Sequence, residues 1–246
     1  MYLQKRRKLS IVSAIWVSIM QHASLGLVVP MYNEAENAEI VIKELYQNLQ
    51  HIQNFRLVVV NNGSTDHTDK ILQQLHIDFD FIYLCLEKNQ GYGGGILDGM
   101  KLIDNCDIVG WIWGDNQIDS AIVPVLYQAI CNGSSIAKTI RIERQDGRFR
   151  KVQSMIYAKI LSNMGIFLKD LHGCPKLFRR DVWKQLRCTH RDWFLDAQSM
   201  ITALEHGYDI YETNAIMKPR LHGKSKVNIQ TSLEFMKNLI RWYWQE

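Results

Sequence analysis

LGLVVPMYNEAENAEIVIKELYQNL, residues 25 to 49, is the stretch of sequence that decides the fold. Its first six residues form an apolar run that ends at Pro30, which predicts a short buried strand. Asn33 and Glu36 have the spacing of a capping box, so a helix is predicted to start there. That helix carries apolar residues at helical spacing, Val41, Ile42, Leu45 and Leu49. A helix with one apolar face packs on a sheet, so the stretch predicts an α/β unit.

The same strand and helix pattern recurs along the first half of the chain. Further strands are predicted at three apolar runs, 56–63, 81–87 and 107–113. Helices are expected from about Thr68 to Leu75 and from the glycine-rich stretch 89–99 to about Ile103. Four strands that alternate with helices predict a mostly parallel, Rossmann-like central sheet, flanked by helices in a single α/β domain.

The alternation becomes weaker after Cys131. The elements expected there are a strand at 135–142, helices at 150–167, 181–186 and 195–205, a loop at 170–178 and a strand at 208–213. The last segment, 232–246, is predicted to be a helix with aromatic, apolar and basic residues close together, namely Phe235, Leu239, Trp242 and Tyr243 with Lys237 and Arg241. Such a helix either lies at a membrane interface or docks on the protein's own surface.

Composition and charge limit the function classes. The 246 residues are 47% hydrophobic and 22% charged, which suits one large domain with a sizeable core. The net charge of +4 is modest and the basic residues gather in local clusters. These clusters favour a local anionic ligand over nucleic acid, with solvated basic faces as the alternative. Five scattered cysteines without a CxxC pair do not make a disulfide framework, which indicates a reducing cytoplasm.

The N-terminal segment has the outline of a targeting signal. Basic residues at 5–8 precede an apolar stretch at 9–20, as in the first two regions of a signal peptide. The stretch is too short to span a bilayer comfortably as a helix, and no clear small-residue cleavage site follows it. We therefore expect a basic leader, 1–23, that touches the membrane or is disordered, with a cleaved signal peptide as the alternative.

Polar motifs follow each of the four predicted strands. They are MYNE (31–34), NNGSTD (61–66), NQGYGGG (89–95) and GDNQ (114–117). Ligands of parallel sheets bind beyond the carboxyl ends of the strands, so these motifs are expected to line one crevice. The glycines fit neither G-x-G-x-x-G nor a P-loop, which argues against a dehydrogenase or an NTPase. They form either a loop that lets a ligand approach the backbone before a helix N-terminus, or a plain tight turn.

Taken in order, these motifs resemble the family 2 glycosyltransferases of GT-A fold, and within them the polyprenyl-phosphate sugar transferases related to dolichol-phosphate mannose synthase. The segments that carry the resemblance are VVPMYNEAEN (28–37), VVVNNGSTDHT (58–68), NQGYGGGILDGM (89–100), WGDNQ (113–117), RKVQS (150–154), KDLHGCPKLFRR (169–180), WFLDAQ (193–198) and RLHGKSK (220–226). The likeness covers about residues 25 to 227. It implies a GT-A domain at 24–227, followed by an amphipathic helix at 228–246.

The resemblance implies an activity and a place of action. The expected reaction is inverting transfer of a sugar from a nucleoside-diphosphate sugar to a polyprenyl phosphate, dolichyl or undecaprenyl. It would take place in the cytoplasm at the cytoplasmic face of a membrane, through peripheral contact or a membrane partner. Two alternatives stay open, a family 2 transferase that uses a glycan or other hydroxyl acceptor, and a nucleotide-sugar-binding protein with little or no catalysis.

The resemblance also implies a set of site residues. The catalytic residues would be Asp115, Asp196 and Arg220. Donor-binding residues would be Pro30, Tyr32, Glu34, Asn62, Asp66, Gly93, Gly114, Ser225 and Lys226. Arg150 and Ser154 would lie near the acceptor phosphate. Asp115 and Gln117 would hold a Mg²⁺ or Mn²⁺ ion that neutralises the leaving diphosphate.

Two departures from the family pattern affect the donor site. The paired acids that follow the second strand are replaced by Asn61 and Asn62, whose amides can donate as well as accept hydrogen bonds. Trp113 stands in place of the first acid of D-x-D, so Asp115 is the carboxylate left there. By itself, an Asp in a Gly-Asp-Asn turn is also a common turn former. Glu34 and Asp66 have a structural alternative too, because helix N-termini attract acids.

Overall fold

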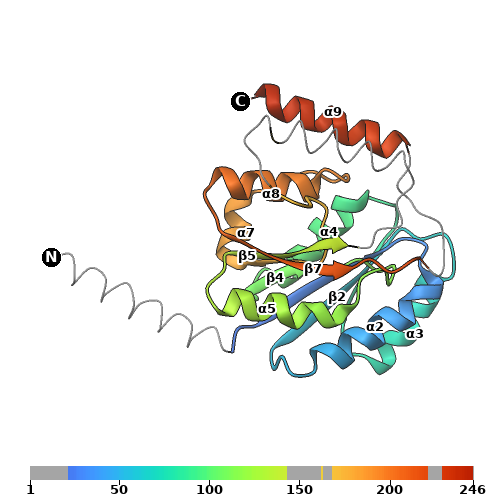
Figure 1. The fold of residues 1–246 in the computed structure, drawn as a ribbon. Coiled ribbons are helices and arrows are strands. Elements are labelled where there is room, and N and C mark those ends of the chain that lie inside the picture. Colours follow the sequence, from blue (N-terminus) through green and yellow to red (C-terminus); the bar gives the residue numbers. More distant parts are fainter. Residues whose placement is uncertain (1–21, 143–161, 163–167, 221–228, 246) are drawn as a thin grey trace, which may run out of the picture.

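The computed structural model describes residues 22–142, 162, 168–220 and 229–245, and Figure 1 shows its fold. Within those ranges seven strands form one sheet in the order β3-β2-β1-β4-β6-β5-β7. Their bounds are β1 Leu25–Met31, β2 Phe55–Asn62, β3 Ile82–Leu86, β4 Ile108–Trp111, β5 Ile136–Ile142, β6 Lys176–Arg179 and β7 Ile210–Ile216. Strands β3, β2, β1 and β4 are parallel, β6 runs antiparallel to β4 and β5, and β5 is parallel to β7. The expected mostly parallel α/β sheet is confirmed.

Helices cover both faces of the sheet. They are α2 Ala35–Leu49, α3 Thr68–Asp78, α4 Tyr92–Met100, α5 Val123–Cys131, α7 Arg180–Leu186, α8 Leu195–Glu205 and α9 Ile229–Gln245. Apolar residues of α2, α3 and α5 pack in one core cluster with one face of the strands, and those of α4, α7, α8 and α9 pack in a second. Along β1, Leu27 and Val29 belong to the first cluster and Val28 to the second, as the alternation of side chains in a strand requires.

Two short elements differ from the sequence-based expectation. The predicted loop 170–178 overlaps β6, and α5 was not predicted. Strand β6 has four residues and includes a lysine, so its apolar run is too short to give a clear periodic signal. Because β6 is antiparallel and lies between β4 and β5, it separates the parallel half of the sheet from the second half.

The capping box predicted at Asn33 and Glu36 is wrong. Asn33 has a left-handed backbone with φ of 53°, and Glu34 is the residue that precedes α2. The Asn33 side chain accepts a hydrogen bond from the Thr65 amide at 2.7 Å and therefore joins the first two strand-end loops. The Asn33 side chain therefore bonds to a residue far away in the sequence, whereas the local pattern predicted that it would cap the helix. The helix predicted at 150–167 lies outside the described residues, apart from residue 162.

The C-terminal helix α9 docks on the protein's own surface, one of the two arrangements that the sequence left open. Phe235 and Leu239 are buried in the second core cluster, on the same side of the sheet as α8 (Figure 1). Asn238 donates to Asp192 at 2.7 Å and fixes the helix next to the start of α8. Within the ranges given above, none of the helices combines the length and apolarity that crossing a membrane requires.

Candidate functional site

Hydrogen bonds join the first three strand-end loops at the carboxyl edge of the parallel strands. The Asn33 amide donates to Ser64 Oγ at 3.0 Å, which joins the loop after β1 to the loop after β2. Asn62 Nδ2 donates to the Gly91 carbonyl at 2.9 Å, and its Oδ1 accepts from the Gln90 amide at 3.0 Å. The loop after β2 is thereby joined to the loop after β3.

The fourth loop packs against the first. A Cβ placed on Gly114 would lie 2.9 Å from the Pro30 carbonyl oxygen and 2.7 Å from Met31 Cγ. A side chain cannot be added there without displacing the backbone, so glycine allows the loop after β4 to approach β1. The four motifs that the sequence placed after strands therefore meet at one edge of the sheet.

An arginine and two carboxylates form the charged centre of this edge. Arg220 Nη2 lies 2.6 Å from Asp115 Oδ2, and Arg220 Nη1 lies 3.5 Å from Glu34 Oε1. The three side chains are largely buried, with exposed fractions of 16%, 13% and 5% for Arg220, Asp115 and Glu34. Three residues assigned to the donor site from different motifs thus contact one another. A guanidinium is a donor that suits the oxygens of anionic ligands such as phosphates.

Gln117 completes the turn that carries Asp115. Its amide N–H donates to Asp115 Oδ1 at 3.2 Å, and its side-chain Nε2 donates to the Lys218 carbonyl at 3.2 Å. Both the turn-former interpretation and the ligand interpretation of Asp115 are compatible with these bonds. The Asp115 carboxylate and the Gln117 amide oxygen are hard donors of the kind that Mg²⁺ and Mn²⁺ accept.

This donor set fits an ion that is shared with a ligand. Within the described ranges, no group of three or more His, Cys, Asp or Glu side chains could hold a metal ion. An ion bound by Asp115 and Gln117 would therefore take its other ligands from phosphate oxygens and water, as Mg²⁺ commonly does.

The two asparagines at the end of β2 hold the neighbouring loops in place. Asn61 Oδ1 accepts from the Ser64 amide at 3.0 Å, and its Nδ2 donates to Asp69 at 3.1 Å. The Asn62 amide uses both its donor and acceptor ends on the loop after β3. Replacement of the paired acids therefore yields neutral side chains that can donate to carbonyl and carboxylate oxygens, which an ionised acid cannot do.

Asp66 has a structural role next to the site. Its Oδ1 accepts from the Thr68 amide at 2.9 Å and from the Thr68 hydroxyl at 2.5 Å, and its Oδ2 accepts from the Ala35 amide at 3.4 Å. Partial burial opposes ionisation of Asp66, but these hydrogen bonds outweigh it and lower the pKa of the carboxyl. The carboxylate joins the starts of α2 and α3, as expected of an acid near helix N-termini.

Gly93 packs against another loop of the protein. A Cβ on Gly93 would lie 2.3 Å from the His190 carbonyl oxygen and 2.8 Å from the Asp192 carbonyl oxygen. The Gly94 amide donates to the Arg191 carbonyl at 2.9 Å. The glycine-rich stretch therefore allows close approach between α4 and the segment before α8. Among the other expected donor residues, Pro30 and Tyr32 are half-buried, while Ser225 and Lys226 lie outside the described residues. The expected acceptor residues Arg150 and Ser154 also lie outside them.

Trp113 is part of an aromatic wall beside Asp115. Its Nε1 donates to the Tyr92 hydroxyl at 2.9 Å, and the Arg141 guanidinium carbon lies 5.4 Å from its ring centroid. Tyr92 in turn stacks on Trp193 with ring centroids 4.3 Å apart. Burial and then the nearby charge of Asp196 raise the pKa of Tyr92, so its hydroxyl stays protonated. The replacement of an acid by Trp113 was visible in the sequence, but its partners were not.

Asp196 lies inside the protein. Its side chain is 1% exposed, with Lys176 Nζ 2.6 Å from Oδ1 and His172 Nδ1 3.6 Å from Oδ2. Burial opposes ionisation of Asp196, but the charge of Lys176 and the hydrogen bond from His172 outweigh it and lower the pKa of Asp196. Sequence reasoning missed Lys176. A lysine within the apolar run CPKLF was the available signal, because a buried lysine needs an anionic partner.

A second ion pair also involves a fully buried lysine. Lys138 Nζ lies 2.7 Å from Glu212 Oε1, and it donates to the Asp170 carbonyl at 2.7 Å. Arg141 forms two hydrogen bonds with the Asp170 carboxylate, at 2.7 and 2.8 Å. Burial opposes ionisation of Asp170, but Arg141 outweighs it and holds the pKa of that carboxyl well below its usual value.

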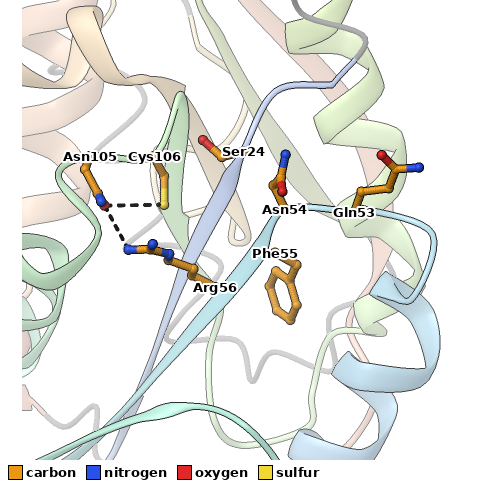
Figure 2. A pocket seen from close by; sticks show the side chains of 7 residues that line it. All are labelled: Ser24, Gln53, Asn54, Phe55, Arg56, Asn105 and Cys106. Atoms are coloured by element: carbon orange, nitrogen blue, oxygen red, sulfur yellow. Dashed lines mark hydrogen bonds between the residues drawn. The ribbon is translucent and has the colours of Figure 1, made fainter.

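A separate hollow lies at the opposite edge of the sheet (Figure 2). It has a volume of about 300 Å³ and is lined by residues at or just before the starts of strands, Ser24, Gln53, Asn54, Phe55, Arg56, Asn105 and Cys106. In parallel sheets the ligand crevice lies at the carboxyl ends of the strands, so this hollow is not part of the candidate site.

Comparisons with known proteins point to one family. Residues 27–187 match the model of the family described as glycosyl transferase family 2. Two similar curated proteins are undecaprenyl-phosphate 4-deoxy-4-formamido-L-arabinose transferases. The one from Photorhabdus laumondii is 26% identical to this chain, and the match covers 91% of this chain and 69% of the relative. The one from Proteus mirabilis is 28% identical, and the match covers 88% of this chain and 66% of the relative. The chain thus spans about two thirds of the length of these relatives.

Solved structures agree on the fold. Glucosyl-3-phosphoglycerate synthase from Mycobacterium tuberculosis, in a complex with Mg²⁺ and UDP, superposes with a TM-score of 0.71 at 17% identity. The match covers 93% of this chain and 82% of that protein. The same enzyme was also crystallised with Mn²⁺, UDP and glucosyl-3-phosphoglycerate. At this identity the likeness shows the fold, which is the expected GT-A arrangement.

Proposed function

The chain belongs to glycosyltransferase family 2, and from this premise we propose that it transfers one sugar, with inversion, from a nucleoside-diphosphate sugar to a polyprenyl phosphate. The names of the curated relatives support undecaprenyl phosphate as the acceptor class. The observation that carries the proposal is the contact of Arg220 with Asp115 and Glu34 at the carboxyl edge of the parallel strands. That edge is where ligands of such sheets bind.

Arg220 supplies the positive charge that the leaving diphosphate requires. Negative charge accumulates on the diphosphate as the glycosidic bond breaks, and a fixed guanidinium stabilises it without reorganisation of the site. Asp115 and Glu34 hold Arg220 in place in the absence of donor. A divalent ion on Asp115 and Gln117, Mg²⁺ or Mn²⁺, would add Lewis-acid neutralisation of the same diphosphate. Pro30, Tyr32, Asn62, Asp66, Gly93, Gly114, Ser225 and Lys226 remain the proposed donor-binding residues.

Burial of Asp196 supports a phosphate acceptor over a hydroxyl acceptor. A hydroxyl must lose a proton during attack, and a general base has to reach that proton within hydrogen-bond distance. Asp196 is 1% exposed and already paired with Lys176. A lipid phosphate is ionised at neutral pH and needs no base. We therefore assign Asp196 a role in orienting groups at the acceptor side, and Arg150 and Ser154 remain proposed contacts of the acceptor phosphate.

The outer face of α9 is the surface proposed to contact the membrane. Its exposed residues include Leu233, Lys237, Ile240, Arg241 and Trp244, which share one side of the helix at spacings of three and four, and also Glu234. Leu233 and Trp244 are 65% and 78% exposed. Apolar and cationic side chains on one exposed helix face suit a surface of anionic lipid. The cytoplasmic face of a membrane carries such lipid and would also present the acceptor.

Nucleotide binding tests the donor site. We would measure thermal shifts with UDP, GDP, CDP and dTDP, with and without Mn²⁺, on the wild type, Asp115→Asn and the control Asp119→Asn. A ligand at ~100 times its Kd adds roughly 2.7 kcal/mol, and at about 2 to 4 °C per kcal/mol such a shift is readable. The expected result is a Mn²⁺-dependent shift with one nucleotide, kept in Asp119→Asn and lost in Asp115→Asn. No shift with any nucleotide would remove the donor site.

Product analysis tests the acceptor. The wild type would be incubated with the donor identified above and either undecaprenyl phosphate or a soluble glycan. Sugar attached to the lipid phosphate, and none attached to the glycan, is the expected outcome. Transfer to the glycan alone favours the hydroxyl-acceptor alternative. Nucleotide binding without transfer to either favours a binding protein.

Vesicle co-sedimentation tests the membrane surface. The wild type should sediment with vesicles that contain phosphatidylglycerol and should bind phosphatidylcholine vesicles more weakly. Trp244→Ala is expected to reduce this binding, because it removes an aromatic side chain of α9 that is 78% exposed. Ile77→Ala on α3, where the wild-type residue is 84% exposed, is the matched control. Equal loss from both variants would contradict a role for the α9 face.

A further inference from the structure

His172 connects the buried Asp196 carboxylate to the protein surface. Its Nδ1 lies 3.6 Å from Asp196 Oδ2, and its side chain is 29% exposed while that of Asp196 is 1% exposed. Its ring packs on Phe235 of α9 with centroids 4.8 Å apart. A carboxylate at Nδ1 fixes the orientation of an imidazole and leaves Nε2 for another partner. Within the described ranges, Nε2 makes no hydrogen bond.

A chain of contacts links His172 to Trp113. Its backbone amide donates to Asp170 at 3.2 Å, and Asp170 holds Arg141, which lies over Trp113. Trp113 is two residues before Asp115. Through Phe235, the ring also contacts the inner face of α9, whose outer face is proposed to lie on lipid. These contacts therefore link His172 both to the loop that carries Asp115 and to the helix proposed to contact the membrane.

We propose that His172 is a further acceptor-binding residue, whose imidazolium Nε2–H donates a hydrogen bond to the phosphate of the lipid acceptor. Asp196 and Lys176 are positioning residues for it. The inference rests on the proposed transferase function and adds a residue that the family motifs did not assign.

The reaction balances without proton transfer at His172. One acceptor phosphate oxygen forms a bond to the anomeric carbon, and the bond from that carbon to the donor diphosphate breaks. The bonding electrons leave with the diphosphate. His172 keeps its proton and binds a phosphate oxygen that does not attack, so it holds the acceptor in line and lowers the repulsion between the two phosphates.

Two ion-paired acids lie next to His172. Asp196 of α8 lies at Nδ1, and Asp170 of the same loop accepts from the His172 amide. Each acid has a cationic partner, Lys176 of β6 and Arg141 of β5 respectively. The partner from α9, Phe235, carries no charge. A bound phosphate adds a further anion next to Nε2, which stabilises an imidazolium.

The test compares His172→Gln with His190→Gln. His190 is a matched control, because it also has a carboxylate, Asp192, 3.6 Å from Nδ1, has the same 29% exposed fraction and packs on a phenylalanine ring at 4.8 Å. KM for undecaprenyl phosphate and kcat would be measured from pH 5.5 to 8.5. The acceptor's own titration is common to all variants, so the ratio of variant to wild type is the quantity to follow.

At pH 6, His172→Gln is expected to raise the acceptor KM about tenfold, the loss of one charge-assisted hydrogen bond, with a smaller change in kcat. The difference from wild type should shrink as pH rises, because deprotonation of the imidazolium removes the proposed Nε2–H donor. Nucleotide thermal shifts and the His190→Gln kinetics should not change. Asp196→Asn should weaken the pH dependence that His172 confers.

Three results would overturn the inference. They are an unchanged acceptor KM in His172→Gln, a difference that grows with pH as for a general base, or an equal effect in His190→Gln. These failures are distinct from failure of the proposed function, in which the wild type itself would transfer no sugar to the lipid phosphate.

Discussion

The two halves of the sheet carry their charges in different places. In the half formed by β3, β2, β1 and β4, charged side chains follow the strands, and Asp115 and Glu34 meet Arg220 at the crevice. In the half formed by β6, β5 and β7, Lys176 and Lys138 lie within strands and are fully buried. They pair with Asp196 and Glu212.

This difference predicts different roles for the charges, ligand binding in the first half of the sheet and stability of the fold in the second. Charges at the strand ends lie where ligands of parallel sheets bind, so a charged ligand can become a new partner for them. A charge buried within a strand has lost its hydration and cannot lose its partner without a large penalty. We therefore expect substitutions in the first half to change ligand binding, and substitutions in the second half to change the free energy of unfolding. Four predictions test this comparison, in decreasing order of expected effect on stability.

Loss of Lys176 should have the largest effect. Lys176→Met leaves the Asp196 carboxylate buried without its cation, which typically reduces stability by about 3 to 5 kcal/mol. The double variant Lys176→Met, Asp196→Leu removes both charges and should be more stable than the single variant. Urea unfolding of both proteins checks this, and a double variant that is less stable than the single one would contradict a coupled pair.

Gly93→Ala should have the next largest effect, because Gly93 is where the glycine-rich loop of the first half contacts the segment before α8. The added methyl group would meet the His190 carbonyl oxygen at 2.3 Å, so backbone must move at about 1 to 3 kcal/mol. Gly94→Ala is the control, since its nearest neighbours are side-chain atoms of Gln90 and Arg191. Thermal unfolding should show a smaller loss of stability for Gly94→Ala than for Gly93→Ala. Equal losses would show that the contact with the His190 carbonyl oxygen is not what destabilises Gly93→Ala.

Acid should weaken the second half through Asp170. Its pKa in the folded protein lies below the unfolded value of about 3.9, so its contribution is present above that pH and is lost as pH falls through the folded pKa. Asp170→Asn should therefore flatten the dependence of unfolding free energy on pH below about 4. Asp66→Asn, at an exposed carboxyl of the first half, should flatten it less. The measurement is urea unfolding at several pH values from 2 to 6.

Arg220→Gln should change stability least and activity most. Arg220 and Asp115 keep 16% and 13% of their side chains exposed, whereas the Lys176–Asp196 pair is almost fully buried, so we expect a smaller loss of unfolding free energy than in Lys176→Met. The rate of sugar transfer should fall by about 100-fold or more, because a fixed donor to the developing charge is removed. Lys218→Gln, at an exposed pair with Asp119, is the control and should keep both properties. A large loss of stability in Arg220→Gln would show that charges in both halves of the sheet contribute similarly to stability, and would contradict the comparison.

Much of the first half could be predicted from the sequence, because its signals are local. Each strand is a continuous apolar run and each strand end carries a polar motif, so the parallel sheet and the crevice followed from spacing. Asn33 shows the limit of such reasoning. Its spacing to Glu36 predicted a capping box, but Thr65, 32 residues away, engages the side chain.

The second half could be predicted less well. Strand β6 is four residues long and contains Lys176, so neither length nor periodicity marked it as a strand. His172 and Lys176 were quoted within a family motif, but nothing in their spacing to Asp196 indicated a contact. The contact arises because β6 inserts antiparallel beside β4 and brings its first residue under α8.

The sequence by itself determined the α/β class, the order of the strand-end motifs and the family. These depend on periodicity and on short motifs, which are properties of neighbouring residues. Only the tertiary structure decided that Arg220 reaches Asp115 and Glu34, and that Asp196 is buried between Lys176 and His172. Partners 105 and 186 residues apart along the chain meet through the packing of the sheet and its helices. Ion pairs and burial depend on that packing, which no local pattern encodes.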